Sequence, residues 1–339
     1  MSMNTPQRPN SALNTPGQGN TSAAPRAARM TLSAVTRGVM AQPIRVVIYG
    51  GGGIGKSTFG SEAPSPIFLG PEDGSALLNV ARFPQPENWT DVRDAIAALR
   101  VESHEYQTLV IDSLDWLEPL CWAHVCAQGR KQSIEDFGYG KGYIAALESW
   151  RAFIADLEAL RKVKRMHIVC IAHSVVAPFK NPAGEDYDRF AMKLHKSASG
   201  LFAEWCDELI FVARKTHAVK VDPKGSRGRG YGGEERVMYT DGAAAFDAKS
   251  RHGLPREMPL SWAEFFAATQ RNTGELAKSI RADIGRALER LSALDAAAGE
   301  TARKAADATG DDPNALNVIL NKINAGIAAR ERSATDTNG

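Results

Sequence analysis

One short run of residues limits the fold of this chain more than any other feature. The sequence VVIYGGGGIGKST joins an apolar run ending at Tyr49 to a glycine-rich loop, which reaches Gly55, Lys56 and Ser57 just before a helical stretch. Four residues separate Gly50 from Gly55, the spacing of a phosphate-binding loop between a buried strand and a helix. Backbone N–H groups of such a loop turn inward around a phosphate. The motif therefore predicts an α/β fold with a phosphate site at one end of its first core strand.

The side chains of this loop predict the ligands ATP and Mg²⁺. We expect Lys56 to neutralise charge on the β- and γ-phosphates and the Ser57 hydroxyl to bind Mg²⁺. A second Mg²⁺ anchor is expected at Asp112, where the apolar strand TLVID ends at the same sheet edge. Asp115 is the alternative, although it should already lie in the next helix and act there as an N-terminal charge. The expected nucleotide-binding residues are Gly50, Gly51, Gly52, Gly53, Ile54, Gly55, Lys56, Ser57 and Thr58.

Hydrolysis also needs a group that orients or deprotonates water, and none adjoins Asp112. A second apolar strand ends in IFLGPEDG, which places Glu72 at the same edge if that strand neighbours the Asp112 strand. Glu72 is the expected catalytic carboxylate. The alternative is that Glu72 is an ordinary turn residue, in which case Asp73 would be the catalytic carboxylate. A further strand ends in CIAHS, so His173 could sense the γ-phosphate or be an ordinary loop histidine. A metal role for His173 is not expected, because no second His or Cys stands at ligand spacing.

From Pro43 onward, short β-rich apolar runs alternate with helical stretches, which indicates parallel α/β units. Two helices are expected between the third and fourth strands, and a hairpin is expected around the segment PKGSRGRGYGGEE. The expected strands are Arg45–Tyr49, Pro66–Leu69, Thr108–Ile111, His167–Ile171 and Glu208–Val212, the helices are Leu114–Ala127 and Gly142–Lys162, and the hairpin strands are His217–Asp222 and Arg236–Thr240.

Composition divides the chain into four parts. Residues 1–40 lack acidic side chains and sustained periodicity, which predicts a disordered basic arm or, as an alternative, a transit peptide. An ATPase core is expected at 41–271 and a helical region at 272–332, with helices Glu275–Ala298 and Pro313–Ala329 separated by DATGDDP, before a disordered tail at 333–339. Four dispersed cysteines favour reduced thiols, and no apolar run is long enough for a membrane helix. We expect a cytoplasmic protein, in the bacterial host if the chain is phage-encoded.

Over about residues 41–270 these positions together resemble the RecA-like recombinase ATPases, and among them the phage-encoded RecA-like single-strand annealing proteins of the Sak type. The resemblance implies a catalytic Glu after the second strand, as Glu72 in GPEDG, and a strand-end Asp without an adjacent Glu. The family's polar sensor, often Gln, corresponds to His173. It also implies that Lys249 and Arg251 of FDAKSRHGLP supply cations to the ATP site of a neighbouring protomer.

The same resemblance implies two loops that bind single-stranded DNA, at Gly129–Gly142 and Ser174–Lys196. Their cations and rings could contact phosphates and stack on bases. The candidate residues are Arg130, Lys131, Phe137, Tyr139, Lys141, Phe179, Lys180, Arg189, Lys193 and Lys196. The hairpin segment Arg214–Arg236 has seven basic and three acidic residues, and its net charge of +4 is plausible for a phosphate-backbone contact.

The sequence therefore predicts a RecA-like α/β ATPase that assembles into a ring or filament. It is expected to act on single-stranded DNA in phage recombination, by annealing or strand exchange, or in replication, with a single-strand-binding protein as a candidate partner. A P-loop kinase of a small acceptor and a non-catalytic, nucleotide-dependent oligomeric scaffold are the alternatives.

Overall fold

The computed structural model describes residue 35 and residues 42–220 and 228–336, without the side chains of 73, 216–220, 228–232, 271–273, 314 and 333–336. The expected N-terminal arm, except residue 35, and the first expected core residue, 41, lie outside the described residues. Residues 337–339 of the expected tail lie outside them as well. The turn of the basic hairpin, at 221–227, also lies outside them.

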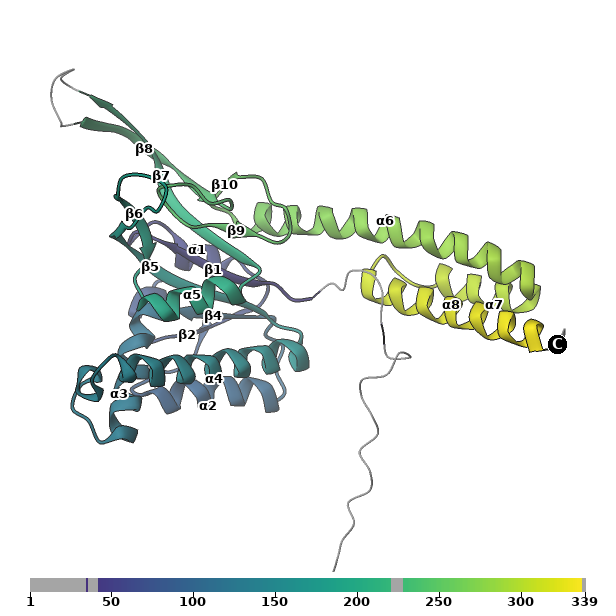
Figure 1. The fold of residues 1–339 in the computed structure, drawn as a ribbon, viewed down its shortest axis with the longest axis horizontal. Helices are drawn as coiled ribbons and strands as arrows, with labels where there is room; N and C mark the ends of the chain where they lie inside the picture. Colours follow the sequence, from purple (N-terminus) through teal and green to yellow (C-terminus); the bar gives the residue numbers. More distant parts are fainter. Residues whose placement is uncertain (1–34, 36–41, 221–227, 337–339) are drawn as a thin grey trace, which may run out of the picture. The chain divides into compact units, whose positions relative to one another are not determined.

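A mostly parallel sheet, with helices packed on it, forms the α/β part of the chain (Figure 1). Its strand order is β10-β8-β7-β1-β5-β4-β2-β3, and the pairs from β7 to β3 are parallel. The strands are β1 (Arg45–Gly50), β2 (Pro66–Leu69), β3 (Ala81–Arg82), β4 (Thr108–Asp112), β5 (His167–Phe179), β7 (Glu208–Lys220), β8 (Gly228–Tyr239) and β10 (Glu257–Pro259). The expected mixed α/β core with a parallel sheet is confirmed. Because β2 lies beside β4, the carboxyl ends of these two strands meet.

Alternating residues of the central strands supply two hydrophobic cores, one on each face of the sheet. In β1, Val47 and Tyr49 join one core, whereas Val46 and Ile48 join the other. The first face carries α2 (Trp89–Val101), α3 (Leu114–Gly129), α4 (Lys141–Lys164) and α5 (Lys196–Trp205). The second face carries α1 (Lys56–Ser61) and the start of α6 (Trp262–Leu294). Both faces of the parallel sheet are thus covered by helices. This packing holds in place the carboxyl ends of the strands, where the candidate polar residues lie.

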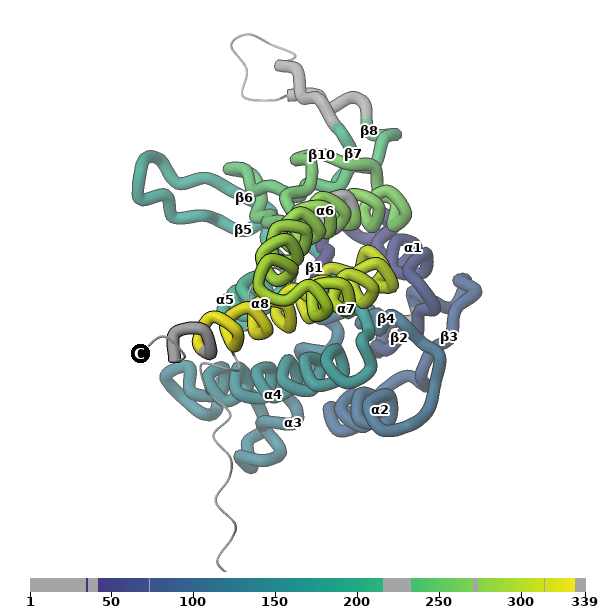
Figure 2. The backbone as a smooth tube through the Cα atoms, turned by 90° about the vertical axis from the view of Figure 1, so that its right-hand side faces the viewer, coloured from purple at the N-terminus to yellow at the C-terminus, as the bar shows by residue number. Residues whose placement is uncertain are grey.

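Two strands continue beyond their expected ends, and this is a correction to the sequence analysis. β5 was expected to stop at Ile171, yet it continues to Phe179 and forms an antiparallel hairpin with β6 (Tyr187–Met192). β7 likewise continues past Val212 and pairs with β8 as a long ribbon. Figure 2 shows the β5–β6 hairpin extending outward from the sheet. The outer half of β7 carries polar and charged residues, whereas the outer half of β5, SVVAPF, is largely apolar but is separated from the buried run by His173 and Ser174.

The C-terminal helices have a hydrophobic core of their own. The second half of α6 packs with α7 (Ala296–Asp307) and α8 (Pro313–Asp336) through residues that include Ile284, Leu291 and Ile323. The break between α7 and α8 lies in DATGDDP, as expected, but a second break at Asp295 divides the helix expected at Glu275–Ala298. Asp295 caps α7, because its side chain accepts a hydrogen bond from the Ala298 N–H at 2.9 Å.

All four cysteines are buried and unpaired. Burial raises the pKa of the Cys121 and Cys206 thiols to about 12, so these two thiols stay protonated near neutral pH. The expected reduced state stays a prediction. Within the described residues, no helix combines the length and the hydropathy that crossing a membrane requires.

Candidate nucleotide site

The glycine-rich loop leaves the sheet between two neighbouring strands. Its first residue, Gly50, is level with Val212 of β7 on one side and His173 of β5 on the other. A Cβ atom at Gly50 would lie 2.3 Å from the Val212 carbonyl oxygen, so only glycine allows this close approach. The loop then passes into α1 at Lys56. The sequence thus places the expected phosphate-binding loop at the carboxyl edge of the sheet.

Lys56 is buried under this loop, with 4% of its surface exposed. Its Nζ donates to the carbonyl oxygens of Gly50 and Gly51, at 3.1 and 2.8 Å. Burial lowers the pKa of Lys56, while the nearby carboxylates of Asp112, Asp115 and Glu72 act in the opposite direction. A buried ammonium that contacts only neutral carbonyls can accept a phosphate as a counter-charge. The residues present therefore fit the β/γ-phosphates of a nucleotide.

Ser57 and Asp112 meet in front of the loop. The Ser57 hydroxyl donates to Asp112 Oδ2 at 2.7 Å. Burial raises the pKa of Asp112, and the adjacent Glu72 raises it further, against the opposite effects of Ser57 and Lys56. A cation bound to Asp112 would offset the electrostatic repulsion between the Asp112 and Glu72 carboxylates. No group of three or more His, Cys, Asp or Glu suited to a metal occurs in the described part of the chain, so Mg²⁺ held by Ser57 and Asp112 would need phosphate and water as its other ligands.

Glu72 lies beside this pair, as the pairing of β2 with β4 requires. Its Oε2 accepts a hydrogen bond from the Ser113 hydroxyl at 3.1 Å, which fixes the carboxylate. A Cβ placed on Gly74 would lie within 3.7 to 3.9 Å of Asp112 Oδ2, Ser57 Oγ and Glu72 Cδ. These three side chains therefore surround one small volume. A cavity of about 370 Å³ opens beside Glu72 and Asp112 and has room for water. The Asp73 side chain lies outside the described residues.

His173 connects Glu72 to Asp115. Its Nε2 is 3.9 Å from Glu72 Oε1, while its backbone N–H and Nδ1 contact the Asp115 carboxylate at 2.9 and 3.0 Å. An ionised carboxylate only accepts, so Nδ1 carries a proton. Although burial opposes it, the hydrogen bonds from His173 hold the pKa of Asp115 below its usual value. Asp115, weighed in the sequence analysis as a metal anchor, instead fixes His173 and lies in the first turn of α3.

A protein-family model described as an AAA domain matches residues 42–252, more than half of the chain. The chain belongs to this AAA domain family. The family indicates a nucleotide-binding ATPase domain, usually with Mg²⁺, which agrees with the geometry of Lys56, Ser57 and Asp112. No curated protein matches the chain.

In the AAA domain, the second candidate DNA-binding segment is the β5–β6 hairpin rather than a loop. The Arg189 side chain is only 14% exposed, pairs with Asp247 at 2.5 Å and lies 5.0 Å from the Phe179 ring centroid. Arg189 and Phe179 thus stabilise the hairpin, and their expected contact with DNA stays a prediction. Lys180 pairs with Asp186 but keeps 90% of its side chain exposed.

Lys193 and Lys196 lie at the base of that hairpin. Lys193 Nζ is 3.9 Å from Asp115 Oδ2, and 60% of the lysine side chain is exposed. Lys196 is the first residue of α5, whose cap, His195, donates its backbone N–H to both oxygens of Glu118 at 3.0 Å. Asp115 and Glu118 of α3 therefore hold the two ends of the hairpin. The sequence analysis missed Glu118, although its spacing of three from Asp115 places both on one helix face.

The first candidate DNA-binding segment lies between α3 and α4. Arg130, Lys131 and Lys141 are exposed, and Tyr139 is fully exposed. Phe137 instead packs against the core, and a Cβ on Gly142 would come within 3.0 Å of its ring. Phe137 is therefore partly buried in the fold, and its expected stacking on a base stays a prediction.

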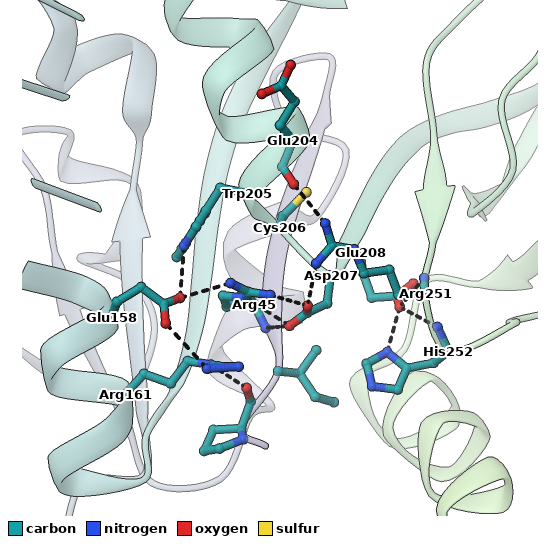
Figure 3. Close-up of polar contacts among 12 residues, drawn as sticks. Arg45, Glu158, Arg161, Glu204, Trp205, Cys206, Asp207, Glu208, Arg251 and His252 are labelled. Atoms are coloured by element: carbon teal, nitrogen blue, oxygen red, sulfur yellow. Dashed lines mark hydrogen bonds and ion pairs between the residues drawn. The ribbon is translucent and has the colours of Figure 1, made fainter. Parts of the chain in front are cut away.

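Lys249 and Arg251 lie at the opposite edge of the sheet from the glycine-rich loop. Lys249 starts β9 (Lys249–Ser250), which pairs with the first residues of β7, level with the start of β1. Its Nζ donates to the carbonyl oxygens of Ala203 and Glu204 at the end of α5. Figure 3 shows Arg251 between the Glu204 carbonyl and Asp207, at 3.0 and 3.4 Å. Neither side chain can reach its own loop, so their expected role in a neighbour's site stays a prediction.

Proposed function

We propose that this AAA domain protein hydrolyses ATP and couples hydrolysis to single-stranded DNA, as a RecA-like ATPase of the phage Sak type would. Its setting would be the bacterial host cytoplasm, in annealing, strand exchange or replication. One observation carries the proposal. Glu72 faces the Ser57–Asp112 pair on one side and His173, at the start of the β5–β6 hairpin, on the other.

The residues of the site have distinct roles in this proposal. Lys56 and the loop N–H groups bind the phosphates, and Mg²⁺ held by Ser57 and Asp112 supplies charge neutralisation when bound. Glu72, oriented by Ser113, accepts a proton from the attacking water. His173 responds to changes at Glu72, because its other ring nitrogen is fixed by Asp115. Asp115 thereby keeps one tautomer of the imidazole.

The exposed cations around the carboxyl edge support DNA as the partner. Lys180, Lys193, Arg130 and Lys131 remain exposed, and Tyr139 offers an uncovered ring for stacking. Assembly of protomers into a ring or filament is part of the proposal, because Lys249 and Arg251 lie away from the loop of their own chain and would act on nucleotide only at a neighbour's site.

The test measures steady-state ATP turnover with and without an oligonucleotide of deoxythymidine. Glu72→Gln should lower turnover by about 10²–10⁴ while ATP binding is retained. The matched control is Glu105→Gln, which removes an equal charge from an exposed loop residue and should leave turnover unchanged.

Three results would contradict the proposal in different ways. Full activity of Glu72→Gln removes the assigned base. The proposed DNA partner would be refuted if single-stranded DNA did not change the turnover and the protein also failed to shift the anisotropy of a labelled oligonucleotide. Transfer of phosphate to a small acceptor, with no DNA binding, would favour a P-loop kinase.

A further inference from the structure

The structure brings a cation to the phosphate-binding loop that the sequence motif does not contain. The ribbon of β7 and β8 continues past the level of Gly50, and Arg214 is opposite Arg236 two residues beyond Val212. Arg236 lies on the same side of β8 as Met238, which is buried in the core that α1 covers. The alternation of the strand therefore turns Arg236 toward α1 and the loop before it.

The Arg236 guanidinium reaches Gly55, the residue directly before Lys56. A Cβ atom on Gly55 would lie 2.9 Å from Arg236 Nη1 and 3.1 Å from Leu260 Cδ2. Gly55 also has φ +110°, a backbone conformation that only glycine adopts easily. The loop at Gly55 is thus shaped for a side chain that comes from β8.

Arg236 differs from the neighbouring cations in its partners. Lys215 pairs with Glu257 at 2.8 Å, Arg256 pairs with Asp241 at 3.0 Å, and Arg214 donates to the Gly233 carbonyl at 2.8 Å. Among the residues that the structure describes, Arg236 has no hydrogen bond or ion pair from its side chain. The Arg236 guanidinium therefore lies against the phosphate-binding loop with no anionic partner among the described residues, and it is available to bind one.

We infer that Arg236 binds a phosphate oxygen of the nucleotide held by the loop of its own chain. This inference rests on the proposed function only in assuming that the loop binds ATP. A guanidinium presents a planar fork of N–H donors that suits phosphate oxygens, and Lys56 approaches from beneath the loop. Arg236 is therefore a nucleotide-positioning residue, and it joins the site to the ribbon of β7 and β8.

The test is the affinity for ATP in the presence of Mg²⁺, measured by calorimetry on the full-length protein. Arg236→Gln should weaken binding by about tenfold or more, because it removes a hydrogen bond between charged groups. Arg236→Lys should recover part of the affinity. Arg214→Gln is the matched control, since it removes the same charge from the opposite residue of the ribbon and should bind ATP as wild type does.

Thermal unfolding without nucleotide provides the second readout. Because Arg236 is exposed and has no partner among the described residues, the melting temperature of the free Arg236→Gln protein should equal that of wild type, while the stabilisation by ATP should shrink. Equal ATP affinity of Arg236→Gln and wild type would overturn the inference, as would an equal loss in Arg214→Gln. If wild type itself bound no ATP, the proposed function would fail instead.

Discussion

Replacing Gly70 by alanine should separate hydrolysis from nucleotide binding. Gly70 follows β2, and a Cβ there would lie 1.8 Å from the Asp112 carbonyl oxygen, whereas real Cβ contacts are essentially never shorter than 3.0 Å. The ends of β2 and β4 must then move apart by about 1.2 Å, the difference between those two distances. Glu72 is only two residues from Gly70, so this movement would break the 3.1 Å hydrogen bond that the Ser113 hydroxyl donates to the Glu72 carboxylate.

The expected effect is large on turnover and moderate on stability. A displacement of about 1 Å in a catalytic group lowers the rate by about 10²-fold. Overpacking of this kind costs about 1–3 kcal/mol in the free energy of unfolding. Affinity for ATP without Mg²⁺ should stay near that of wild type, because β5 separates β4 from β1 and its loop, whereas the contribution of Mg²⁺ should weaken as Asp112 moves away from Ser57.

Turnover, ATP affinity and melting temperature should be measured on Gly70→Ala and on Gly200→Ala. A Cβ on Gly200, in α5, would meet nothing within 4 Å, so this control should keep its turnover and gain up to about 1 kcal/mol in helix stability. A folded Gly70→Ala protein with wild-type turnover would refute the reasoning, because it would mean that the contact between β2 and β4 does not position Glu72.

Two further predictions concern pH and assembly. Burial raises the pKa of Glu118 from 4.5 to about 7, so the folded protein retains a proton that the unfolded chain releases, and stability should fall as the pH rises through this window. Urea unfolding at several pH values should show Glu118→Gln gaining stability over wild type toward alkaline pH, and a constant difference would contradict the assignment. The double variant Lys249→Ala with Arg251→Ala should regain partial ATP turnover when mixed with Lys56→Ala, if each supplies what the other lacks at a shared interface. If the two variants co-assemble and the mixture stays inactive, Lys249 and Arg251 only cap the end of α5 and do not act at a neighbour's site.

The central strands could be predicted from sequence because a strand buried on both faces is a continuous apolar run. β1, β2 and β4 agree with the expected ranges to within one residue. The outer half of β7 is polar and carries no such signal, and in β5 the apolar residues after Ser174 follow a polar interruption at His173 and Ser174. Among the described strands, each outer half pairs with one partner. The break at Asp295 was also missed, because neither glycine nor proline marks it.

The positions of Lys56, Ser57 and Asp112 follow from the motif and from strand ends, which local sequence reveals. The contact of Asp115 with His173 and the approach of Arg236 to Gly55 depend on which strands are neighbours and on their register. Such non-local pairings are set by the packing of the whole sheet. No spacing in the sequence could have shown them.

The continuity of β5 has a mechanical consequence. Its first half is fixed between β1 and β4, whereas among the described strands its second half pairs with β6 alone, so the strand can bend at His173. The contacts of β6 with residues 245–247 limit how far the hairpin can move. The six residues beyond His173 reach about 20 Å at about 3.3 Å per residue, and a tilt of about 10° at His173 would move the tip by about 3.5 Å. A rearrangement too small to disturb the core could therefore move Lys180 by the length of a hydrogen bond.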